Sequence, residues 1–242
     1  MRNIRVTRSV IPNLFTSMNM FSGFLSLVYA NEGKFIDAAV FIIIGSVFDA
    51  LDGIMARLTK SSSEFGVELD SLSDLVSFGV APAFLIYKAH LFQYGAIGIV
   101  ISSLLMVLGG LRLARFNVQL VGFDKSYFTG LPIPSSAITI ASFILVYYRD
   151  GYIIEPFSSF VIPLVIILSL LMVSKIRYET LPKLSAKGIK ERPYSFTFLI
   201  ISALVVVATK GIAIFYIFIL MILIGIFKHL FLHLLQKKET AK

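Results

Sequence analysis

Long apolar stretches separated by short polar breaks make up most of the chain. A helix that crosses a bilayer needs about 20 predominantly apolar residues, and eight stretches approach this length. The breaks between them are rich in Gly, Pro, Asn, Asp and Ser, which favour turns. The pattern predicts an all-α integral membrane protein, a bundle of about eight transmembrane helices at residues 11–30, 36–57, 72–92, 94–115, 135–149, 157–174, 196–209 and 212–235.

Composition agrees with a membrane protein. Hydrophobic residues make up 57% of the chain and charged residues 15%, whereas a soluble domain carries about 25% charged residues. The chain contains no cysteine, which excludes disulfides and thiolate metal sites. A bound metal would therefore take oxygen or histidine ligands.

The lysines and arginines are distributed unequally between the two ends of the predicted helices. Eight crossings place both termini on one side, and the other side holds few of the 22 basic residues, namely Lys34, Lys88, Arg149 and Lys210. Basic loops stay in the cytoplasm, so we expect both termini there, with the protein in the inner or plasma membrane. Basic residues spread over every cytoplasmic loop indicate topology and attraction to anionic lipid headgroups, and no nucleic-acid partner is expected.

Four aspartates form two pairs near predicted cytoplasmic helix ends. Asp49 and Asp52 are three residues apart and Asp70 and Asp74 are four apart, so each pair shares one face of a helix. A loop of about a dozen residues would join the two helices and make them antiparallel neighbours. We therefore expect the four carboxylates to converge.

The negative charge of four neighbouring carboxylates must be balanced by positive charge. Each carboxylate in a membrane segment costs about 2.5–3.5 kcal/mol, and like charges add repulsion. Two divalent cations with oxygen ligands, Mg²⁺ or Mn²⁺, would compensate and could clamp both sides of a phosphoryl displacement. The alternative is that the acids are snorkelling or salt-bridged residues at helix ends, which would suit one aspartate better than four.

These residues belong to a longer motif, D-x2-D-G-x2-A-R-x8-G-x3-D-x3-D. Every fixed position is filled, by Asp49, Asp52, Gly53, Ala56, Arg57, Gly66, Asp70 and Asp74. In this motif the chain resembles the CDP-alcohol phosphotransferase family. The resemblance implies a homodimer with six core transmembrane helices. The chain would then be a single transmembrane catalytic domain, with a basic N-terminal segment (1–10), the six-helix core (11–174), a basic cytoplasmic loop (175–195) and an added C-terminal helix pair (196–235).

The same resemblance implies roles for the motif residues. The four aspartates would bind the two cations, and Asp74 would also be the catalytic general base. The CDP group would be bound by Asp52, Gly53, Ala56, Arg57 and Gly66. From the residues alone, Gly53 and Ala56 could equally be small residues for helix packing.

Three further stretches suggest the acceptor alcohol, because they look most like the serine-using branch of the family: 11–16, 63–82, and 112–117 followed by 130–134. The donor would be CDP-diacylglycerol or an ether-lipid analogue, and the acceptor L-serine, in a membrane of other lipids. Arg112, Arg115 and Asn117, with Asn13 and Thr16 on the first helix, are the candidate acceptor ligands. The two arginines could instead serve topology only, and Asn13 and Thr16 could serve hydrogen bonding between helices.

Two rival hypotheses remain at this point. The same chemistry could use glycerol 3-phosphate or an inositol phosphate as acceptor, because a phosphorylated acceptor needs the same cations. A cation-coupled transporter would also hold intramembrane aspartates, although it would place them near the middle of the membrane.

Overall fold

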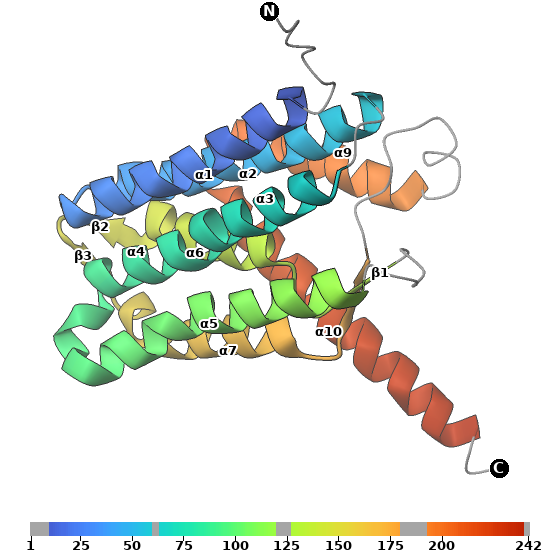
Figure 1. Ribbon diagram of the computed structural model, residues 1–242. Helices are drawn as coiled ribbons and strands as arrows, with labels where there is room; N and C mark the ends of the chain where they lie inside the picture. The colour runs from blue at the N-terminus through green and yellow to red at the C-terminus, as the bar shows by residue number, and fades with distance from the viewer. Residues whose placement is uncertain (1–9, 60–62, 120–126, 180–192, 240–242) are drawn as a thin grey trace, which may run out of the picture.

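The computed structural model describes residues 10–59, 63–119, 127–179 and 193–239 (Figure 1). Within these residues the chain is almost entirely helical. The helices are α1 (Val10–Asn31), α2 (Phe35–Thr59), α3 (Glu64–Asp74), α4 (Ala81–Ala89), α5 (Gly95–Gln119), α6 (Ile133–Tyr147), α7 (Val161–Val173), α9 (Pro193–Ala208) and α10 (Ala213–Glu239). Shorter helical turns are η1 (Leu75–Val80), η2 (Leu91–Tyr94) and η3 (Phe157–Phe160).

All eight predicted helices are present, because α3, η1 and α4 form one continuous helix over 64–89. The prediction was wrong about where this helix begins, at Glu64 rather than residue 72. Only residues 60–63, not a dozen, separate it from α2. Ser63 caps its first turn, accepting a hydrogen bond from the Gly66 N–H at 3.0 Å. The polar character of α3 hid this part of the helix from a count of apolar residues.

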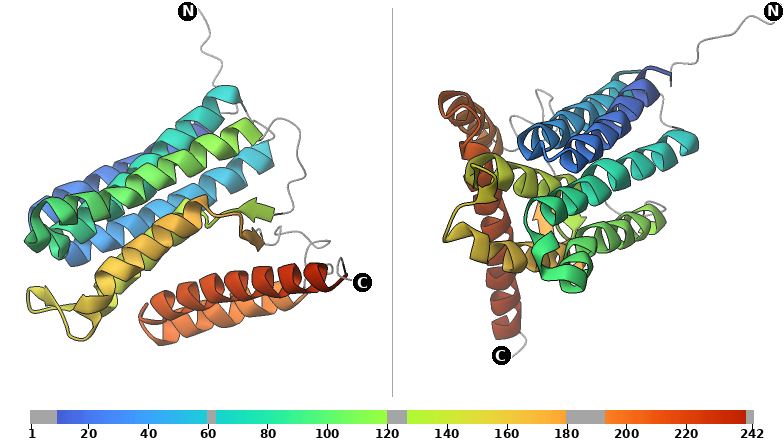
Figure 2. Two further views of the ribbon diagram at one scale, coloured as in Figure 1. Left: turned by 90° about the horizontal axis from the view of Figure 1, so that it is seen from below. Right: turned by 90° about the vertical axis from the view of Figure 1, so that its left-hand side faces the viewer.

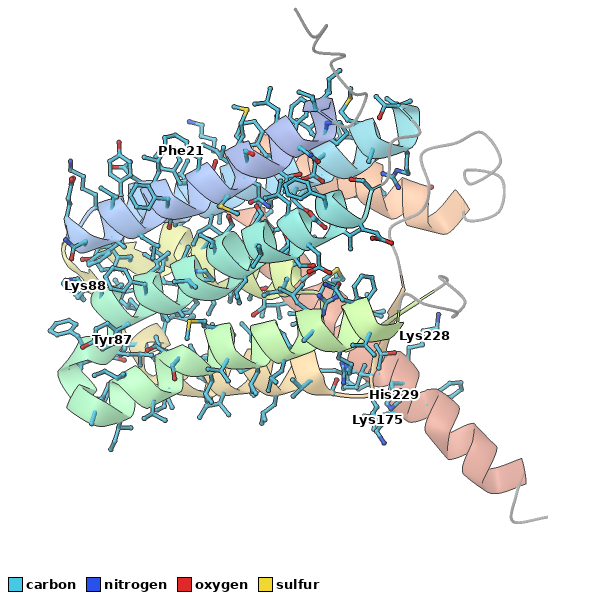
Figure 3. All side chains as sticks on the ribbon, in the orientation of Figure 1. Phe21, Tyr87, Lys88, Lys175, Lys228 and His229 are labelled. Carbon is cyan, nitrogen blue, oxygen red and sulfur yellow. The ribbon has the colours of Figure 1, made fainter. Side chains whose placement is uncertain are left out.

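Four helical segments of the described chain are long and apolar enough to cross a membrane: Phe35–Thr59, Glu64–Ala89, Leu91–Val118 and Ala213–Phe231. The shorter apolar helices are Ile133–Tyr147 and Phe157–Val173. Helix α1 has 22 residues but carries several polar ones, and these point inward: Thr16, Asn19, Ser22 and Ser26 are buried. Phe21, on its outer side, is 58% exposed (Figure 3). The helices therefore form a multi-pass membrane protein with apolar outer surfaces.

Successive helices run in opposite directions (Figures 1 and 2). The start of α1, the end of α2 and the start of α3 consequently lie at the same end of the bundle, together with the end of α5. Lys88 lies at the opposite end from Lys175 and Lys228 (Figure 3). These three lysines therefore lie at the ends of the bundle that the sequence assigned to them.

Helix α6 is largely enclosed by the other helices, with Ile140, Ala141 and Ile144 fully buried. Helix α1 packs along α2, and α5 packs along α7 (Figure 1). Helix α10 contacts α6, where the hydroxyl groups of Tyr147 and Tyr216 are 2.9 Å apart. This contact is one of those that attach the C-terminal helices to the rest of the bundle.

Two short antiparallel strand pairs complete the fold. Strand β2 (Tyr148–Arg149) pairs with β3 (Tyr152–Ile153), and β1 (Tyr127–Thr129) pairs with β4 (Arg177–Glu179). The β1–β4 pair links the segment before α6 to the segment after α7. Burial raises the pKa of Tyr178 in β4 to about 12. The Tyr178 ring packs against Gly225 of α10, where a Cβ would overlap it.

Candidate active site

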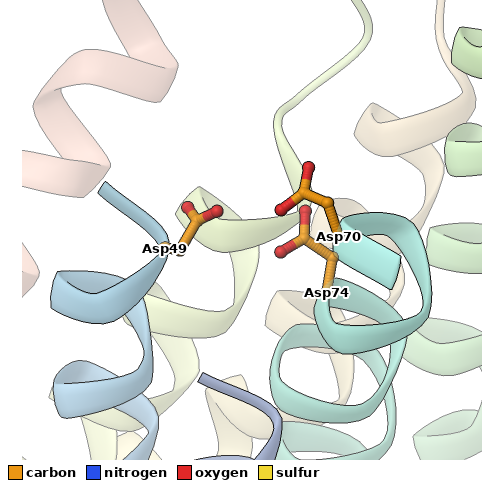
Figure 4. A group of neighbouring side chains, drawn as sticks. All are labelled: Asp49, Asp70 and Asp74. Atoms are coloured by element: carbon orange, nitrogen blue, oxygen red, sulfur yellow. The ribbon is translucent and has the colours of Figure 1, made fainter. Parts of the chain in front are cut away.

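Three aspartates from two helices meet near one end of the bundle (Figure 4). Asp49 projects from α2, and Asp70 and Asp74 project from α3 toward it. Each offers a carboxylate oxygen, and these three oxygens all lie within 4.8 Å of one another. The spacing inferred from the sequence therefore brings together residues that are 25 positions apart along the chain, as Asp49 and Asp74 are.

Asp52, the fourth predicted ligand, lies one turn along α2 and is not in this group of three. It is 7% exposed and lies beside Thr16 of α1. Its Oδ2 atom has no hydrogen-bond partner in the described part of the chain, nor does Oδ1 of Asp70. Buried oxygens in folded proteins are normally paired with a donor, an ordered water or a cation, so these two are candidates to bind a metal ion or a donor group of a ligand.

The charge of this group is only partly balanced by the protein. Arg112 of α5 is 6% exposed, and its positive charge acts on the Asp74 carboxylate. One guanidinium neutralises at most one of the four carboxylates. Oxygen-only ligands of this kind suit hard divalent cations, so the residues fit the metal site that the sequence predicted.

Polar contacts of α1 with α3 and with η1 hold Asp74 in place. The Asn19 amide Nδ2 donates to Asp74 Oδ1 at 3.5 Å. The hydroxyl groups of Ser73 and Ser77 donate to the main-chain oxygens of Thr16 and Asn19, at 2.9 and 2.8 Å. These bonds fix the angular position of α3 relative to α1, and with it the direction of the Asp74 side chain.

The helix geometry changes directly after Asp74. Segment η1 is a π-helical stretch, in which the Ala81 N–H bonds to the Val76 oxygen five residues back. Pro82 follows and has no N–H to donate, so regular α-helical bonding would leave a carbonyl without its donor. Single π-helical turns occur often at functional sites.

The predicted CDP-binding residues have different surroundings. A Cβ added to Gly53 would meet no atom within 4 Å, so the surface of α2 beside Asp52 is open. Ala56 is half-buried and Arg57 is exposed. At Gly66 an added Cβ would lie 3.1 Å from Ser63 Oγ and 3.4 Å from Asn13 Oδ1. Gly66 therefore has a packing reason to be glycine, whereas Gly53 has none in the described protein.

The predicted acceptor ligands are also separated by the structure. Asn13 and Thr16 lie on α1, with Asn13 near Gly66 and Thr16 near Asp52. Asn117 donates to Ser71 Oγ at 2.9 Å. Their acceptor role stays a prediction, and the Asn117 contact is a hydrogen bond between helices, from α5 to α3.

The two arginines differ. Arg112 lies beside the carboxylates, whereas the hydrogen bonds of Arg115 within the described residues all go to main-chain oxygens, of Thr129, Met172, Val173 and Ser174. The structure thus accounts for Arg115 without an acceptor.

The sequence interpretation missed Ser71, Ser73 and Ser77 as contributors to this region. Ser73 and Ser77 are four residues apart, directly before and three residues after Asp74. That spacing puts them on one face of the helix, which is the available signal. It does not reveal that their partners are main-chain oxygens of α1.

The fold and the site together define a membrane-embedded enzyme whose carboxylates lie near one end of a helical bundle. The sequence pattern of the CDP-alcohol phosphatidyltransferase family matches residues 9–173, from just before α1 to the last residue of α7. The chain belongs to this family, which is a family of phosphotransferases.

Curated relatives match most of the same region. CDP-diacylglycerol–serine O-phosphatidyltransferase of Helicobacter pylori is 38% identical over 178 residues, covering 72% of this chain and 73% of the relative. Archaetidylserine synthase of Methanothermobacter thermautotrophicus is 42% identical over 181 residues, covering 74% and 72%. The Bacillus subtilis CDP-diacylglycerol–serine O-phosphatidyltransferase is 35% identical over 183 residues, covering 74% and 96%.

A solved structure supports the fold. Mycobacterium tuberculosis phosphatidylinositol phosphate synthase with CDP-DAG bound superposes with a TM-score of 0.52, covering 70% of this chain and 84% of that one. The sequences are 20% identical, so the likeness concerns the arrangement of helices.

Proposed function

We propose that the protein transfers the phosphatidyl-type group of a CDP-activated lipid to the hydroxyl of L-serine and releases CMP. The observation that carries this proposal is the meeting of Asp49, Asp70 and Asp74 within the complete family motif. Serine as the acceptor is supported by the relatives, which are named for serine transfer in both bacteria and an archaeon. Two of these names specify CDP-diacylglycerol and the third archaetidylserine, so the donor is CDP-diacylglycerol or an ether-lipid analogue, as the sequence left open.

Asp74, Asn19 and Arg112 act on the acceptor side of the reaction. Asp74 accepts the proton of the serine hydroxyl, while Asn19 holds its other oxygen. The serine oxygen forms a bond to the lipid-side phosphorus, and the bond from that phosphorus to the bridging oxygen of CMP breaks. Arg112, buried beside Asp74, binds the serine carboxylate, for which a guanidinium fork is well shaped.

The remaining motif residues bind the donor. Gly53 leaves the surface of α2 open beside Asp52, so that the flat CDP group can approach the helix. Arg57, Ala56 and Gly66 complete the CDP site. Asp49, Asp52, Asp70 and Asp74 would hold two Mg²⁺ or Mn²⁺ ions, which when bound neutralise the diphosphate and stabilise the charge that develops during displacement.

An acceptor screen tests this function. The purified protein in lipid should release CMP from CDP-diacylglycerol only when L-serine and Mg²⁺ or Mn²⁺ are both present. Glycerol 3-phosphate and inositol phosphate serve as competing acceptors, and equal CMP release with either would contradict the serine assignment. Serine uptake into vesicles without CMP formation would instead favour a transporter, an alternative that the family match does not support.

We further propose that the carboxylate end faces the cytoplasm at the plasma membrane, that 1–242 is a single transmembrane catalytic domain, and that the enzyme is a homodimer. The first point is supported by the basic residues, because Lys88, one of the four that the sequence assigned to the outer side, lies at the opposite end of the bundle from Lys175 and Lys228. The chain has no cysteine, so Lys34→Cys and Lys175→Cys give single reactive sites. A membrane-impermeant maleimide should label Lys34→Cys in intact cells, and labelling of Lys175→Cys instead would reverse the orientation.

A further inference from the structure

The side chain of Arg115 connects three segments of the bundle. Its Nη1 donates to the Val173 oxygen at 3.0 Å, and its Nη2 donates to the Thr129 oxygen at 3.0 Å. Longer contacts reach the oxygens of Met172 (3.4 Å) and Ser174 (3.5 Å). The last carbonyls of a helix lack donors within the helix and attract cations, so Arg115 of α5 caps α7 while also binding the residue before Gly130.

The start of α6 and the end of α7 pack closely against each other beside Arg115. Gly130 has φ +84°, and an added Cβ would overlap the Met172 oxygen and lie 3.0 Å from Arg115 Nη2. The Gly130 N–H donates to the Ile176 oxygen at 2.8 Å, and the Leu131 N–H donates to the Leu171 oxygen at 2.9 Å. Arg115 therefore sits where the start of α6 and the end of α7 are already joined. A planar guanidinium reaches two carbonyls at once, which a lysine ammonium on a flexible stem does less well.

The same part of α5 also faces the carboxylates. Arg112 is three residues before Arg115, on the same side of the helix, and its charge acts on Asp74. Two residues after Arg115, Asn117 bonds to Ser71 at 2.9 Å, next to Asp70. The end of α5 is thus attached to α7 through Arg115 and to α3 through Asn117.

We infer that Arg115 is a positioning residue that acts through Arg112: by fixing the end of α5 on α7, it keeps the Arg112 guanidinium where it meets both Asp74 and the acceptor. This inference rests on the proposed function, in which Arg112 binds the serine carboxylate. It reassigns Arg115, which the sequence had suggested as a second direct ligand. A direct ligand and a positioning residue differ in how the effects of changing Arg112 and Arg115 on the kcat/KM for serine combine.

A double-mutant cycle separates these roles. Arg115→Lys keeps the charge but loses the planar fork, and it should lower the kcat/KM for serine by about tenfold or more, the scale of a small misplacement in an active site. In an Arg112→Ala background the same change should lower kcat/KM by less than about twofold, because residues that act through one another are not additive. Arg149→Lys is the matched control. Arg149 also donates to main-chain oxygens, of Leu145 and Tyr148, but near the other end of the bundle, and its replacement should leave serine kinetics unchanged.

The contradicting outcomes are distinct. An equal loss in both backgrounds would make Arg115 an independent contact with the acceptor, and unchanged kinetics in Arg115→Lys would remove it from the reaction. Arg115→Gln is the second variant, and failure of both to fold would leave Arg115 purely structural and overturn the inference. Wild-type protein without serine-dependent CMP release would refute the proposed function, whereas an active wild type with additive variants refutes only the positioning role.

Discussion

Replacing Asp49 by asparagine should stabilise the metal-free protein while removing its response to metal. The carboxylate oxygens of Asp49, Asp70 and Asp74 lie within 4.8 Å of one another. At that separation and an effective dielectric constant of about 20, two unit charges repel by roughly 3 kcal/mol. Asp49→Asn removes two of the three repulsive pairs but keeps nearly the same shape. We expect the free energy of unfolding without metal to rise by about 1–3 kcal/mol, since relaxation of the side chains and of nearby water reduces the full Coulomb value.

Thermal unfolding in detergent or nanodiscs measures this effect. For a protein of this size, 1 kcal/mol corresponds to roughly 2–4 °C in Tm. In EDTA the Tm of Asp49→Asn should therefore exceed that of the wild type by several degrees. Added Mn²⁺ should raise the Tm of the wild type, because ligands that bind only the folded state stabilise it, and should raise that of Asp49→Asn much less.

Asp37→Asn provides the control, because Asp37 is an exposed acid in the first turn of the same helix, at its other end. Its replacement removes a charge without touching the cluster, so the Mn²⁺ response should stay that of the wild type. A lower Tm of Asp49→Asn in EDTA, combined with an undiminished Mn²⁺ shift, would refute the reasoning that these carboxylates repel one another and share a cation.

Three further predictions concern the base, the acceptor and the packing of α1. Asp74→Asn should lower kcat by at least about 10²-fold while the CDP-lipid still binds, as measured by CMP release and by equilibrium binding; substantial remaining activity would exclude Asp74 as the base. Arg112→Ala should raise the KM for serine more than it lowers kcat, and an unchanged KM would return Arg112 to a purely topological role. Gly23→Ala should cost about 1–3 kcal/mol of stability in thermal unfolding, because the new Cβ would lie 2.5 Å from Ser77 Oγ and 2.7 Å from Ser77 Cα. Gly53→Ala, with nothing within 4 Å, is its stability control, and equal Tm values for the two variants would show that α1 and η1 are not packed as described.

The features that depend on local periodicity could be predicted from the sequence. Within the described residues, apolar length predicted the eight long helices, apart from the polar start of the third, and the three- and four-residue spacing of the aspartates predicted which of them share a face. The meeting of Asp49 with Asp70 and Asp74 followed because the two helices are antiparallel neighbours, whatever the length of the loop between them. Asp52 belongs to the same motif, but its side chain lies beside Thr16 instead of within the group of three.

The features that were not predicted depend on contacts between distant segments. The pairing of β1 with β4 joins residues about 50 positions apart, and no local pattern marks strands of three residues. The partners of Arg115 are main-chain oxygens, which every residue possesses, so the sequence cannot identify them. The start of α3 was placed too late because capping by Ser63, not hydropathy, determines where this helix begins.

The most direct test of the metal site is the position of Mn²⁺ in crystals of the protein grown with Mn²⁺ and CDP-lipid. Anomalous scattering should place Mn²⁺ between α2 and α3, with oxygens of Asp49, Asp70 and Asp74 among its ligands. Manganese bound elsewhere, or these three carboxylates turned away from one another with the nucleotide in place, would contradict the account.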